Sequence, residues 1–282
     1  MHKRSFFISL LILFPLLFAC QNNKSRSNAQ KEIPGLAKLE PQPRYDTMLQ
    51  ALQLLQNDPL LQKASLGYLV VDVTNKNPVI VADYHAKKPM IPASTLKIFV
   101  TGAALEYFGK QVIPEVTVTN QMSVNWRSSK LLRKIGGKVY QTHTTAAGAK
   151  AILDFWSTKG VDTEGMNFYD GNGLSRNNAI SPKQLVDALY AMRTSPYFDV
   201  FYESLPLAGL TGTLHKAMKG SAAEGRVHAK TGTIGKVKSF AGYVVTVTGR
   251  QLIFSLIVND YDCRVKLMKK KMEDVMISMA EI

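Results

Sequence analysis

The sequence predicts an α+β fold, in which helices flank an antiparallel sheet and a helical lobe stands beside it. Segments rich in branched and aromatic residues, which are typical of strands, lie near both ends of the chain, at residues 66–71 and 79–82 and again within residues 226–258. An Asn-Lys-Asn-Pro turn at residues 75–78 joins the first two segments as an antiparallel pair. Helical periodicity dominates the stretch between, roughly residues 94–218, which we therefore expect to form the lobe.

The first 44 residues are expected to lie outside the folded domain. Residues 1–19 are typical of a secretory signal peptide, because basic residues precede an apolar run that is too short to span a bilayer. The Leu-Phe-Ala-Cys stretch that ends at Cys20 resembles a bacterial lipoprotein cleavage site, at which the cysteine is lipidated and becomes the first mature residue. Residues 20–44 would then be the lipidated cysteine and a flexible polar tether, and residues 45–282 the folded domain. We therefore predict an exported lipoprotein of the bacterial periplasm or cell envelope, anchored to the membrane through Cys20.

Amphipathic patterns and turn residues predict the remaining elements. Helices are expected at residues 45–56, 96–107, 124–135 and 145–159, directly after Ser181, and at residues 265–279. The later strands are expected at residues 226–233, 240–247 and 252–258. Ser181 is followed by a proline and, three residues on, by Gln184, the signature of a capped helix start. Gly109 is expected to end the second helix, and Gly136 and Gly137 the third.

The charge balance restricts the possible partners. The formal net charge is +14, from 35 Lys and Arg residues against 21 Asp and Glu residues. In an exported protein this excess favours contact with anionic lipids or envelope polymers, and we expect no nucleic acid. The five histidines show no spacing typical of metal ligands, so we predict neither a metal nor a cofactor.

The sequence around Ser94 is the leading candidate for a reactive site. Ser94 stands at the start of the second helix, where unpaired N–H groups and the positive end of the helix dipole lie beside it. Lys97 is three residues on, which places its amine next to the Ser94 hydroxyl. A hydroxyl is a poor nucleophile until a base takes its proton, and a lysine in a dry, cationic pocket can lose its charge and become that base. Taken alone, the pair also fits a helix N-cap followed by a solvated lysine.

Two further motifs follow this S-x-x-K pair along the chain. Ser175 and Asn177 form S-x-N in a glycine-punctuated loop, which the helix after Ser181 pins in place. Lys230, Thr231 and Gly232 form K-T-G on an expected strand. S-x-x-K, S-x-N and K-T-G in this order are the signature of serine penicillin-binding proteins and their β-lactamase relatives.

The residues around the motifs narrow the resemblance. PASTLK, DGNGLSRNN and AKTG are similar to the low-molecular-mass, class C D-alanyl-D-alanine carboxypeptidase/endopeptidase family, and the likeness runs from about residue 66 to the C-terminus. It implies a penicillin-binding catalytic domain with the β-lactamase/transpeptidase-like fold. It also implies removal of the terminal D-alanine from peptidoglycan stem peptides, or cleavage of their cross-links, through a Ser94 acyl-enzyme that β-lactams would block.

The resemblance also implies roles for individual residues. Lys97 is expected to be the base, Ser175 to relay a proton to the departing D-alanine, and Asn177 to orient the substrate amide. The N–H groups of Ser94 and Thr233 are expected to form the oxyanion hole.

The third motif is expected to bind the substrate. Lys230 and Thr231 place a cation and a hydroxyl on a strand edge, suited to the terminal carboxylate of a peptide. Gly232 has no side chain, so we expect the backbone to approach the substrate closely there.

Departures from the family pattern leave some choices open. Members usually carry one or two extra domains between the first and second motifs, and this chain has too few residues there to hold them. Asn178 is the alternative to Asn177 in the second motif. A further S-x-N at residues 123–125 lacks a preceding glycine loop, so we interpret Ser123 as a helix N-cap.

Two other functions fit the same motifs. One is a β-lactamase or esterase, which would need a deacylating base; Glu164 is the acid nearest the second motif but has no recognisable context for that role. The other is a sensor lipoprotein that binds β-lactams or muropeptides with slow turnover or none. The sequence does not separate carboxypeptidase from endopeptidase activity.

Overall fold

The computed structural model describes residues 45–112 and 121–282, which belong to one compact unit. The expected signal peptide at residues 1–19, Cys20 and the tether up to residue 44 lie outside the described residues. In the described part of the chain, no helix combines the length and the apolar character that a membrane span requires.

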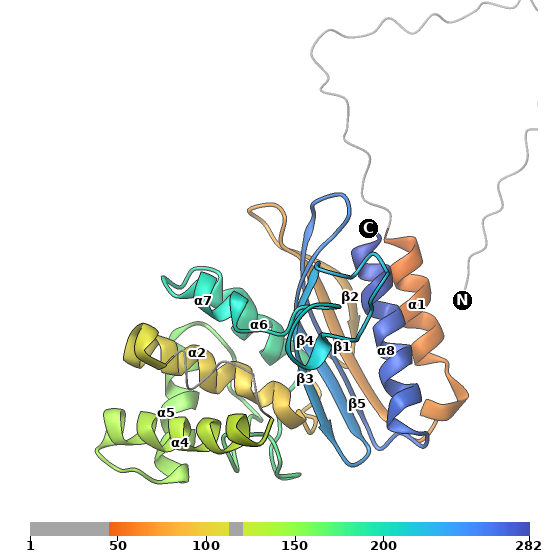
Figure 1. Ribbon diagram of the computed structural model, residues 1–282. Coiled ribbons are helices and arrows are strands. Elements are labelled where there is room, and N and C mark those ends of the chain that lie inside the picture. The colour runs from red at the N-terminus through yellow and green to blue at the C-terminus, as the bar shows by residue number, and fades with distance from the viewer. Residues whose placement is uncertain (1–44, 113–120) are drawn as a thin grey trace, which may run out of the picture. The chain divides into compact units, whose positions relative to one another are not determined.

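A five-stranded antiparallel sheet stands at the centre of the structure (Figure 1), as predicted. Its strands are β1 (Ser65–Asp72), β2 (Val79–Tyr84), β3 (Val227–Ile234), β4 (Val237–Val245) and β5 (Gln251–Asn259), in the spatial order β2-β1-β5-β4-β3. The pairing of β1 with β5 joins the two ends of the chain, with Leu69 opposite Ser255. The order leaves β2 and β3 as the edge strands, and β3 carries the K-T-G motif.

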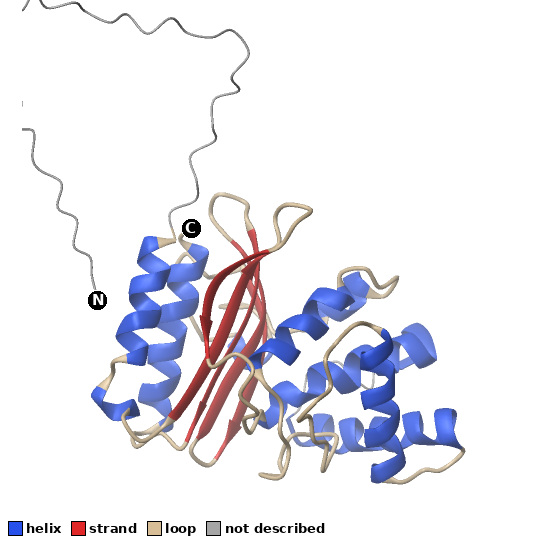
Figure 2. Cartoon of the chain, turned by 180° about the vertical axis from the view of Figure 1, so that it is seen from behind, coloured by secondary structure: helices blue, strands red, loops and turns tan. Residues whose placement is uncertain are grey.

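Helices cover both faces of the sheet (Figures 1 and 2). On one face α1 (Asp46–Gln56) packs beside α8 (Val265–Ala280), so the two helices at the ends of the domain lie together. On the other face lie α2 (Lys97–Phe108), α4 (Gln121–Tyr140), α5 (Thr145–Thr158), α6 (Pro182–Met192) and α7 (Phe198–Glu203). These helices are the predicted lobe.

The two-sided covering explains why the strands are apolar without strict alternation. In β5, Ile253 and Ile257 belong to the core beneath the lobe, whereas Phe254 and Leu256 belong to the core beneath α1 and α8. All four side chains are fully buried. The sheet therefore separates two hydrophobic cores.

Helix α2 runs through the middle of the lobe and is buried on almost every side. The sequence predicted one apolar face, but Ile98 and Leu105 are buried as well as the predicted Phe99. The Trp156 ring of α5 meets the Phe99 ring edge-on at 5.5 Å, and its indole N–H donates to the Phe99 carbonyl at 3.1 Å. This packing fixes the helix that starts at the Ser94 motif.

The predicted helix ends are partly correct. Ser181 caps α6 through a reciprocal capping box: its hydroxyl accepts from the Gln184 N–H at 3.2 Å, and its own N–H donates to the Gln184 side chain at 2.8 Å. Gly109 ends α2 with a φ of +65°, as expected. Ser123 is not an N-cap, because α4 begins at Gln121 and Ser123 lies inside it.

Gly136 and Gly137 do not end a helix; α4 continues through them to Tyr140. A Cβ atom on Gly136 would lie 2.6 Å from the Gly148 nitrogen. The absence of a side chain at Gly136 therefore allows the backbones of α4 and α5 to approach each other closely. The three atoms nearest to a Cβ on Gly137 would instead all belong to the ring of His143, an exposed side chain. The glycine pair was therefore predicted to end the helix, whereas the structure uses Gly136 for close packing of two helices.

The lysines on the outer face of α8 form ion pairs. Lys269 and Lys270 pair with Glu273 and Asp274 one turn on, and Lys271 pairs with Asp58.

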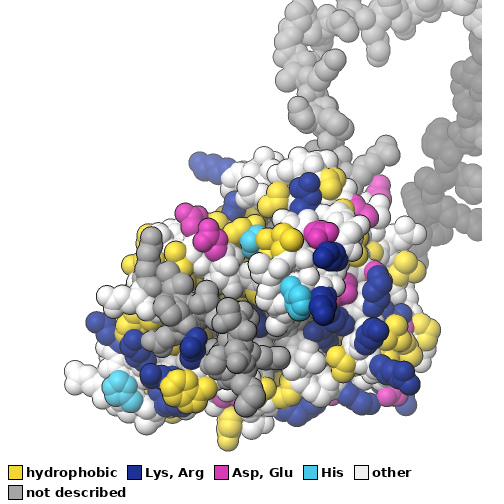
Figure 3. Space-filling view, in the orientation of Figure 1, with side chains coloured by type: hydrophobic (Ala, Val, Ile, Leu, Met, Phe, Trp, Pro, Cys, Tyr) yellow, Lys and Arg dark blue, Asp and Glu magenta, His cyan; other side chains and the backbone are white. Residues whose placement is uncertain are grey.

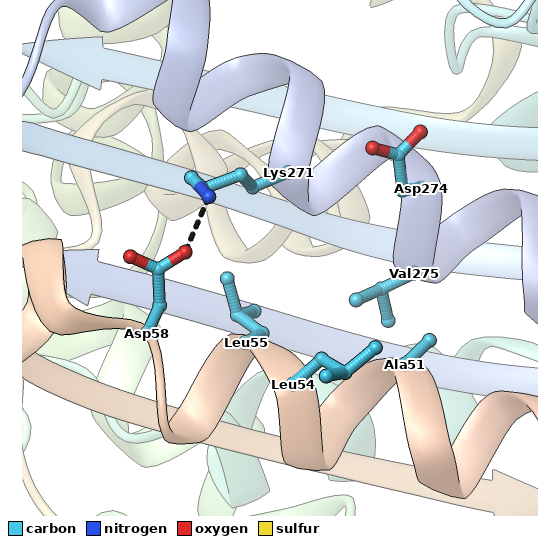
Figure 4. A pocket seen from close by; sticks show the side chains of 7 residues that line it. All are labelled: Ala51, Leu54, Leu55, Asp58, Lys271, Asp274 and Val275. Carbon is cyan, nitrogen blue, oxygen red and sulfur yellow. Dashed lines mark ion pairs between the residues drawn. The ribbon is translucent and has the colours of Figure 1, made fainter.

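The pair of Lys271 and Asp58 borders a pocket between α1 and α8, lined also by Ala51, Leu54, Leu55, Asp274 and Val275 (Figure 4). This pocket lies on the face of the sheet opposite the lobe. Elsewhere, Lys and Arg side chains gather at several places on the surface seen in Figure 3.

The two glycines of α4 provide a matched stability test. Gly136→Ala should lower the free energy of unfolding by several kcal/mol, because the new methyl meets backbone atoms that cannot move aside. Gly137→Ala should be neutral or raise it by up to about 1 kcal/mol through helix propensity, since the His143 ring can rotate away. Urea unfolding of the two variants measures the difference, and equal effects would contradict the close-approach role of Gly136.

Candidate active site

Ser94 lies in a strained turn that leads into α2. The turn is a 3₁₀ segment, Ala93–Leu96, and Ala93 adopts a left-handed φ of +46°, which is uncommon for a residue other than glycine. The carbonyl of Pro92 accepts hydrogen bonds from the Thr95 and Ser239 hydroxyls, each at 2.6 Å. The turn is therefore fastened to β4, which provides Ser239, and the half-buried Ser94 hydroxyl is held at the junction of sheet and lobe.

A second clamp fixes the segment that precedes the turn. Asn259 lies at the end of β5, and its side chain accepts from the Ile91 N–H at 2.8 Å and donates to the Ile91 carbonyl at 3.0 Å. Both backbone groups of Ile91 are thereby satisfied by one side chain. The position of Ser94 is therefore determined by contacts with the sheet as well as by α2.

Lys97 contacts the Ser94 hydroxyl directly, as the S-x-x-K spacing predicted. Its Nζ lies 2.8 Å from Ser94 Oγ and also donates to the carbonyl oxygen of Asn172. The side chain is only 4% exposed. Burial, followed by the positive charge of Lys230 and opposed by Asp170, lowers the pKa of Lys97 to about 6. The amine is thus mostly neutral at pH 7 and able to accept the serine proton.

The second-motif loop is organised by one carboxylate that the sequence analysis overlooked. Asp170 accepts hydrogen bonds from the N–H groups of Asn172, Gly173 and Ser175, at 2.7–3.1 Å. The loop also rests on α4, where the Asn172 side chain donates to Ser129 Oγ at 2.9 Å. The Asp-Gly-Asn-Gly composition was the available signal, because aspartate commonly accepts from nearby backbone N–H groups in turns.

The loop touches the nucleophile through its backbone. The Asn172 carbonyl accepts from Lys97 and lies 3.3 Å from Ser94 Oγ, which also donates to it. Gly173, at a φ of +82°, comes so close to the turn that a Cβ there would lie 2.0 Å from the Ala93 carbonyl oxygen. Only glycine fits this contact, so Gly173 sets the distance between the loop and Ser94.

Ser175 and Asn177 follow at the mouth of the loop. Ser175 is half-buried, and its hydroxyl accepts from the Asn177 N–H at 3.1 Å. Asn178 is 1% exposed; its amide accepts from the Tyr169 and Asp170 N–H groups and donates to Asp170 Oδ1 and to the Ser175 carbonyl. The amide of Asn178 is therefore used inside the loop, and Asn177 is the exposed asparagine of the pair.

The K-T-G motif lies on β3 directly behind the Ser94 turn. Lys230 is 8% exposed and its Nζ donates to the Thr231 carbonyl at 2.9 Å. Burial and the nearby charge of Lys238 lower its pKa to about 8, so it still carries a charge at pH 7. The Thr231 hydroxyl lies 2.9 Å from that of Thr213, a residue that the sequence analysis did not single out.

Gly232 is required for packing within the protein. A Cβ there would lie 2.2 Å from Ser239 Oγ and 2.8 Å from the Pro92 carbonyl oxygen. The expected reason for this glycine was close approach of the substrate, whereas the observed contacts are with β4 and the nucleophile turn. Gly232 thus lets β3 pass against the turn that carries Ser94.

The free edge of β3 presents backbone donors next to Ser94. The Ala229 N–H donates to the Pro206 carbonyl at 2.9 Å, on the side away from β4. Because alternate residues of a strand direct their N–H groups to the same side, those of Thr231 and Thr233 also face this edge. Among the described residues, neither N–H forms a backbone hydrogen bond outside the strand ladders. The Thr233 N–H thus faces the open edge of β3, and its part in an oxyanion hole stays a prediction.

The chain matches one protein family over most of its length. Residues 48–125 and 113–281 match the D-Ala-D-Ala carboxypeptidase 3 (S13) family. The chain belongs to this family. The resemblance seen in the three motifs is thereby confirmed.

Curated proteins are similar in sequence to part of this chain. It is 37% identical over 146 residues to a D-alanyl-D-alanine carboxypeptidase of an Actinomadura species, a stretch that is 50% of this chain and 27% of that protein. It is 32% identical over 170 residues to penicillin-sensitive carboxypeptidase A of Dictyostelium discoideum, covering 56% of this chain and 32% of the relative. The aligned region therefore spans about a third or less of the length of these relatives.

Solved structures share the fold. Penicillin binding protein 4 (dacB) from Haemophilus influenzae, complexed with a β-lactam, superimposes with a TM-score of 0.67 at 14% identity, covering 80% of this chain and 97% of that one. The TLA-3 extended-spectrum β-lactamase gives 0.59 at 15% identity, covering 84% and 98%. These matches confirm the predicted β-lactamase/transpeptidase-like fold.

Two lysine-to-arginine changes should separate the predicted base from the predicted carboxylate-binding cation. Lys97→Arg should lower the acylation rate of Ser94 by about 10²–10⁴-fold, because arginine stays protonated and cannot accept the serine proton. Lys230→Arg keeps a positive charge and should lower the acylation rate by at most about tenfold. Rates of acylation by a fluorescent penicillin measure both, and equal losses would contradict the division of roles.

The two lysine pKa values predict a bell-shaped pH profile for acylation. Below about pH 6 the Lys97 amine is protonated and cannot act as the base, so the rate should rise with pH through this value. Above about pH 8 Lys230 loses its charge and the rate should fall again. The Lys230→Arg variant should keep the rise in rate at acid pH and show a smaller fall at alkaline pH. An alkaline fall that is unchanged in this variant would assign it to another group.

Proposed function

We propose that this chain is a serine-type D-alanyl-D-alanine carboxypeptidase that acts on peptidoglycan stem peptides through a Ser94 acyl-enzyme. The observation that carries the proposal is the contact of a buried, largely neutral Lys97 amine with the Ser94 hydroxyl, beside a strand edge that carries K-T-G. Membership of the S13 family supports the choice of substrate. Cleavage of peptide cross-links by the same Ser94 chemistry, an endopeptidase activity, is the alternative within this proposal.

Acylation begins with proton transfer from Ser94 Oγ to Lys97 Nζ. The oxygen attacks the carbonyl carbon between the two D-alanines, and the N–H groups of Ser94 and Thr233 stabilise the charge that develops on the carbonyl oxygen. The C–N bond then breaks, and Ser175 passes a proton from Lys97 to the departing amine. Lys230 and Thr231 hold the carboxylate of the leaving D-alanine.

Water completes the cycle by attacking the acyl-enzyme ester. Departure of D-alanine opens the space on the leaving-group side of the ester, and the neutral Lys97 amine is again able to take a proton. Transfer of that proton to Ser94 Oγ releases the shortened peptide. The same groups therefore serve both half-reactions, in reverse order.

The placement of acids favours the peptidase over a β-lactamase. Asp170 acts electrostatically on Lys97, but its oxygens already accept from three backbone N–H groups and the Asn178 amide. Glu164 is exposed. A carboxylate free to activate water would speed hydrolysis of a penicilloyl-enzyme, and neither of these two residues is suited to that role.

We propose that the chain works outside the cytoplasm, anchored through a lipid on Cys20. The apolar run before this cysteine and the polar stretch after it support export and a tether. Cys20→Ala should move the protein from the membrane pellet to the soluble fraction after cell disruption without lowering its specific activity. If wild type and variant distribute alike, lipidation at Cys20 is excluded.

Penicillin treatment of residues 21–282 tests the proposed function. The drug should acylate Ser94, and the adduct should persist because its opened ring stays tethered in the cleft and blocks water. Intact-mass spectrometry over time follows the adduct, with Ser94→Ala as the control, and D-alanine release from a D-alanyl-D-alanine peptide is measured in parallel.

Each alternative function predicts a different result. An adduct that disappears as the drug is consumed indicates a β-lactamase. A stable adduct without release of D-alanine indicates the sensor lipoprotein. No adduct on Ser94 would exclude the proposed site altogether.

A further inference from the structure

Lys238 of β4 is a buried cation that the proposed mechanism does not use. It is 4% exposed, and its Nζ lies 4.7 Å from the centre of the Phe240 ring. Within residues 45–112 and 121–282 it forms no ion pair; Glu273 of α8, which acts on it electrostatically, pairs with Lys269. A buried ammonium is costly unless something nearby benefits from its charge.

The hydrogen bond of Lys238 is directed at the active-site edge. Its Nζ lies 2.7 Å from the hydroxyl oxygen of Thr233, its cross-strand neighbour on β3. An ammonium can only donate, so the Thr233 oxygen must be the acceptor. The hydroxyl hydrogen of Thr233 must then point elsewhere, and because Thr233 is exposed it is free to donate to a ligand.

The strand register places this hydroxyl beside a second one. Side chains of alternate strand residues lie on the same face, so Thr231 and Thr233 project from β3 together, whereas Lys230 projects from the opposite face. The Thr231 hydroxyl is held by Thr213 at 2.9 Å. Two hydroxyls thus flank the open β3 edge, and the positive charge behind them comes from Lys238.

We propose that Lys238 is a positioning residue, which makes the Thr233 hydroxyl a charge-assisted donor to the carboxylate on the leaving-group side of the scissile bond. This inference rests on the proposed function and adds to it the residue that enforces selectivity for a free carboxylate. A hydrogen bond donated by a hydroxyl that itself accepts from a cation is stronger than an isolated one. Lys230 would bind the same anion from the other face of the strand.

Penicillin G and its methyl ester test this selectivity, because they differ only in the carboxylate. We expect Lys238→Met to lower the second-order rate of Ser94 acylation by penicillin G about 10–100-fold and to change the rate with the ester less than about threefold. Lys236→Met is the matched control, since Lys236 lies on the same hairpin, is exposed and pairs with Asp262. It should leave both rates within about twofold.

Thr233→Val separates positioning from a general loss of structure. The variant removes the hydroxyl and keeps the backbone N–H, and it should reproduce the loss of selectivity seen in Lys238→Met. Adding Lys238→Met to Thr233→Val should then change the penicillin rate less than about twofold. Thermal unfolding of each variant reports its folding.

The outcomes distinguish this inference from the proposed function. Equal loss of both rates in Lys238→Met, or a full effect of Lys238→Met in the Thr233→Val background, would overturn the role of Lys238. Acylation with the expected selectivity but no release of D-alanine would contradict the carboxypeptidase and leave the role of Lys238 intact. A wild-type protein that penicillin fails to acylate would overturn both.

Discussion

The contact between a desolvated Lys97 amine and the Ser94 hydroxyl is the interaction on which the site depends. Keeping this lysine neutral at pH 7, against an ordinary pKa of 10.5, costs about 5 kcal/mol of folding free energy. Only a large, well-packed domain can bear that cost. The buried α2 helix, held by Trp156, and the two cores on either side of the sheet are the features that offset it.

The rest of the site is organised around that amine by backbone contacts. The Asn172 carbonyl takes one of its hydrogen bonds, and Asp170 holds the loop that provides this carbonyl. Gly173 and Gly232 then bring the loop and β3 against the Ser94 turn at distances that no side chain would allow. Three segments far apart in sequence are therefore held together by glycine contacts and main-chain hydrogen bonds, which makes the geometry rigid before a substrate arrives.

The three buried lysines near β3 differ in how readily they lose their charge. Lys97 is deprived of its proton by burial, and the cations behind it, Lys230 and Lys238, retain more of theirs because their pKa values lie near 8. The lysine that we propose as the base is thus mostly neutral, while positive charge stays available at the two lysines that we propose to act on the anion. Repulsion among the lysines contributes to this order, since the charge of Lys230 lowers the pKa of Lys97 and that of Lys238 lowers the pKa of Lys230.

The sequence by itself identified the candidate reactive residues, the strands and most of the helices, because each of these depends on a local pattern. An i, i+3 spacing brings Lys97 to Ser94, and runs of branched and aromatic residues predict the strands. The serine–proline–glutamine pattern predicts the α6 capping box. The tertiary structure alone decided which distant backbone lies against a given residue. The Gly-Gly pair at residues 136–137 is typical of a helix end, and only the packing of α5 shows that Gly136 serves close helix contact. Lys238 gains its role only because the strand register places it opposite Thr233. Such contacts depend on pairing between segments far apart in the chain, which no local pattern encodes.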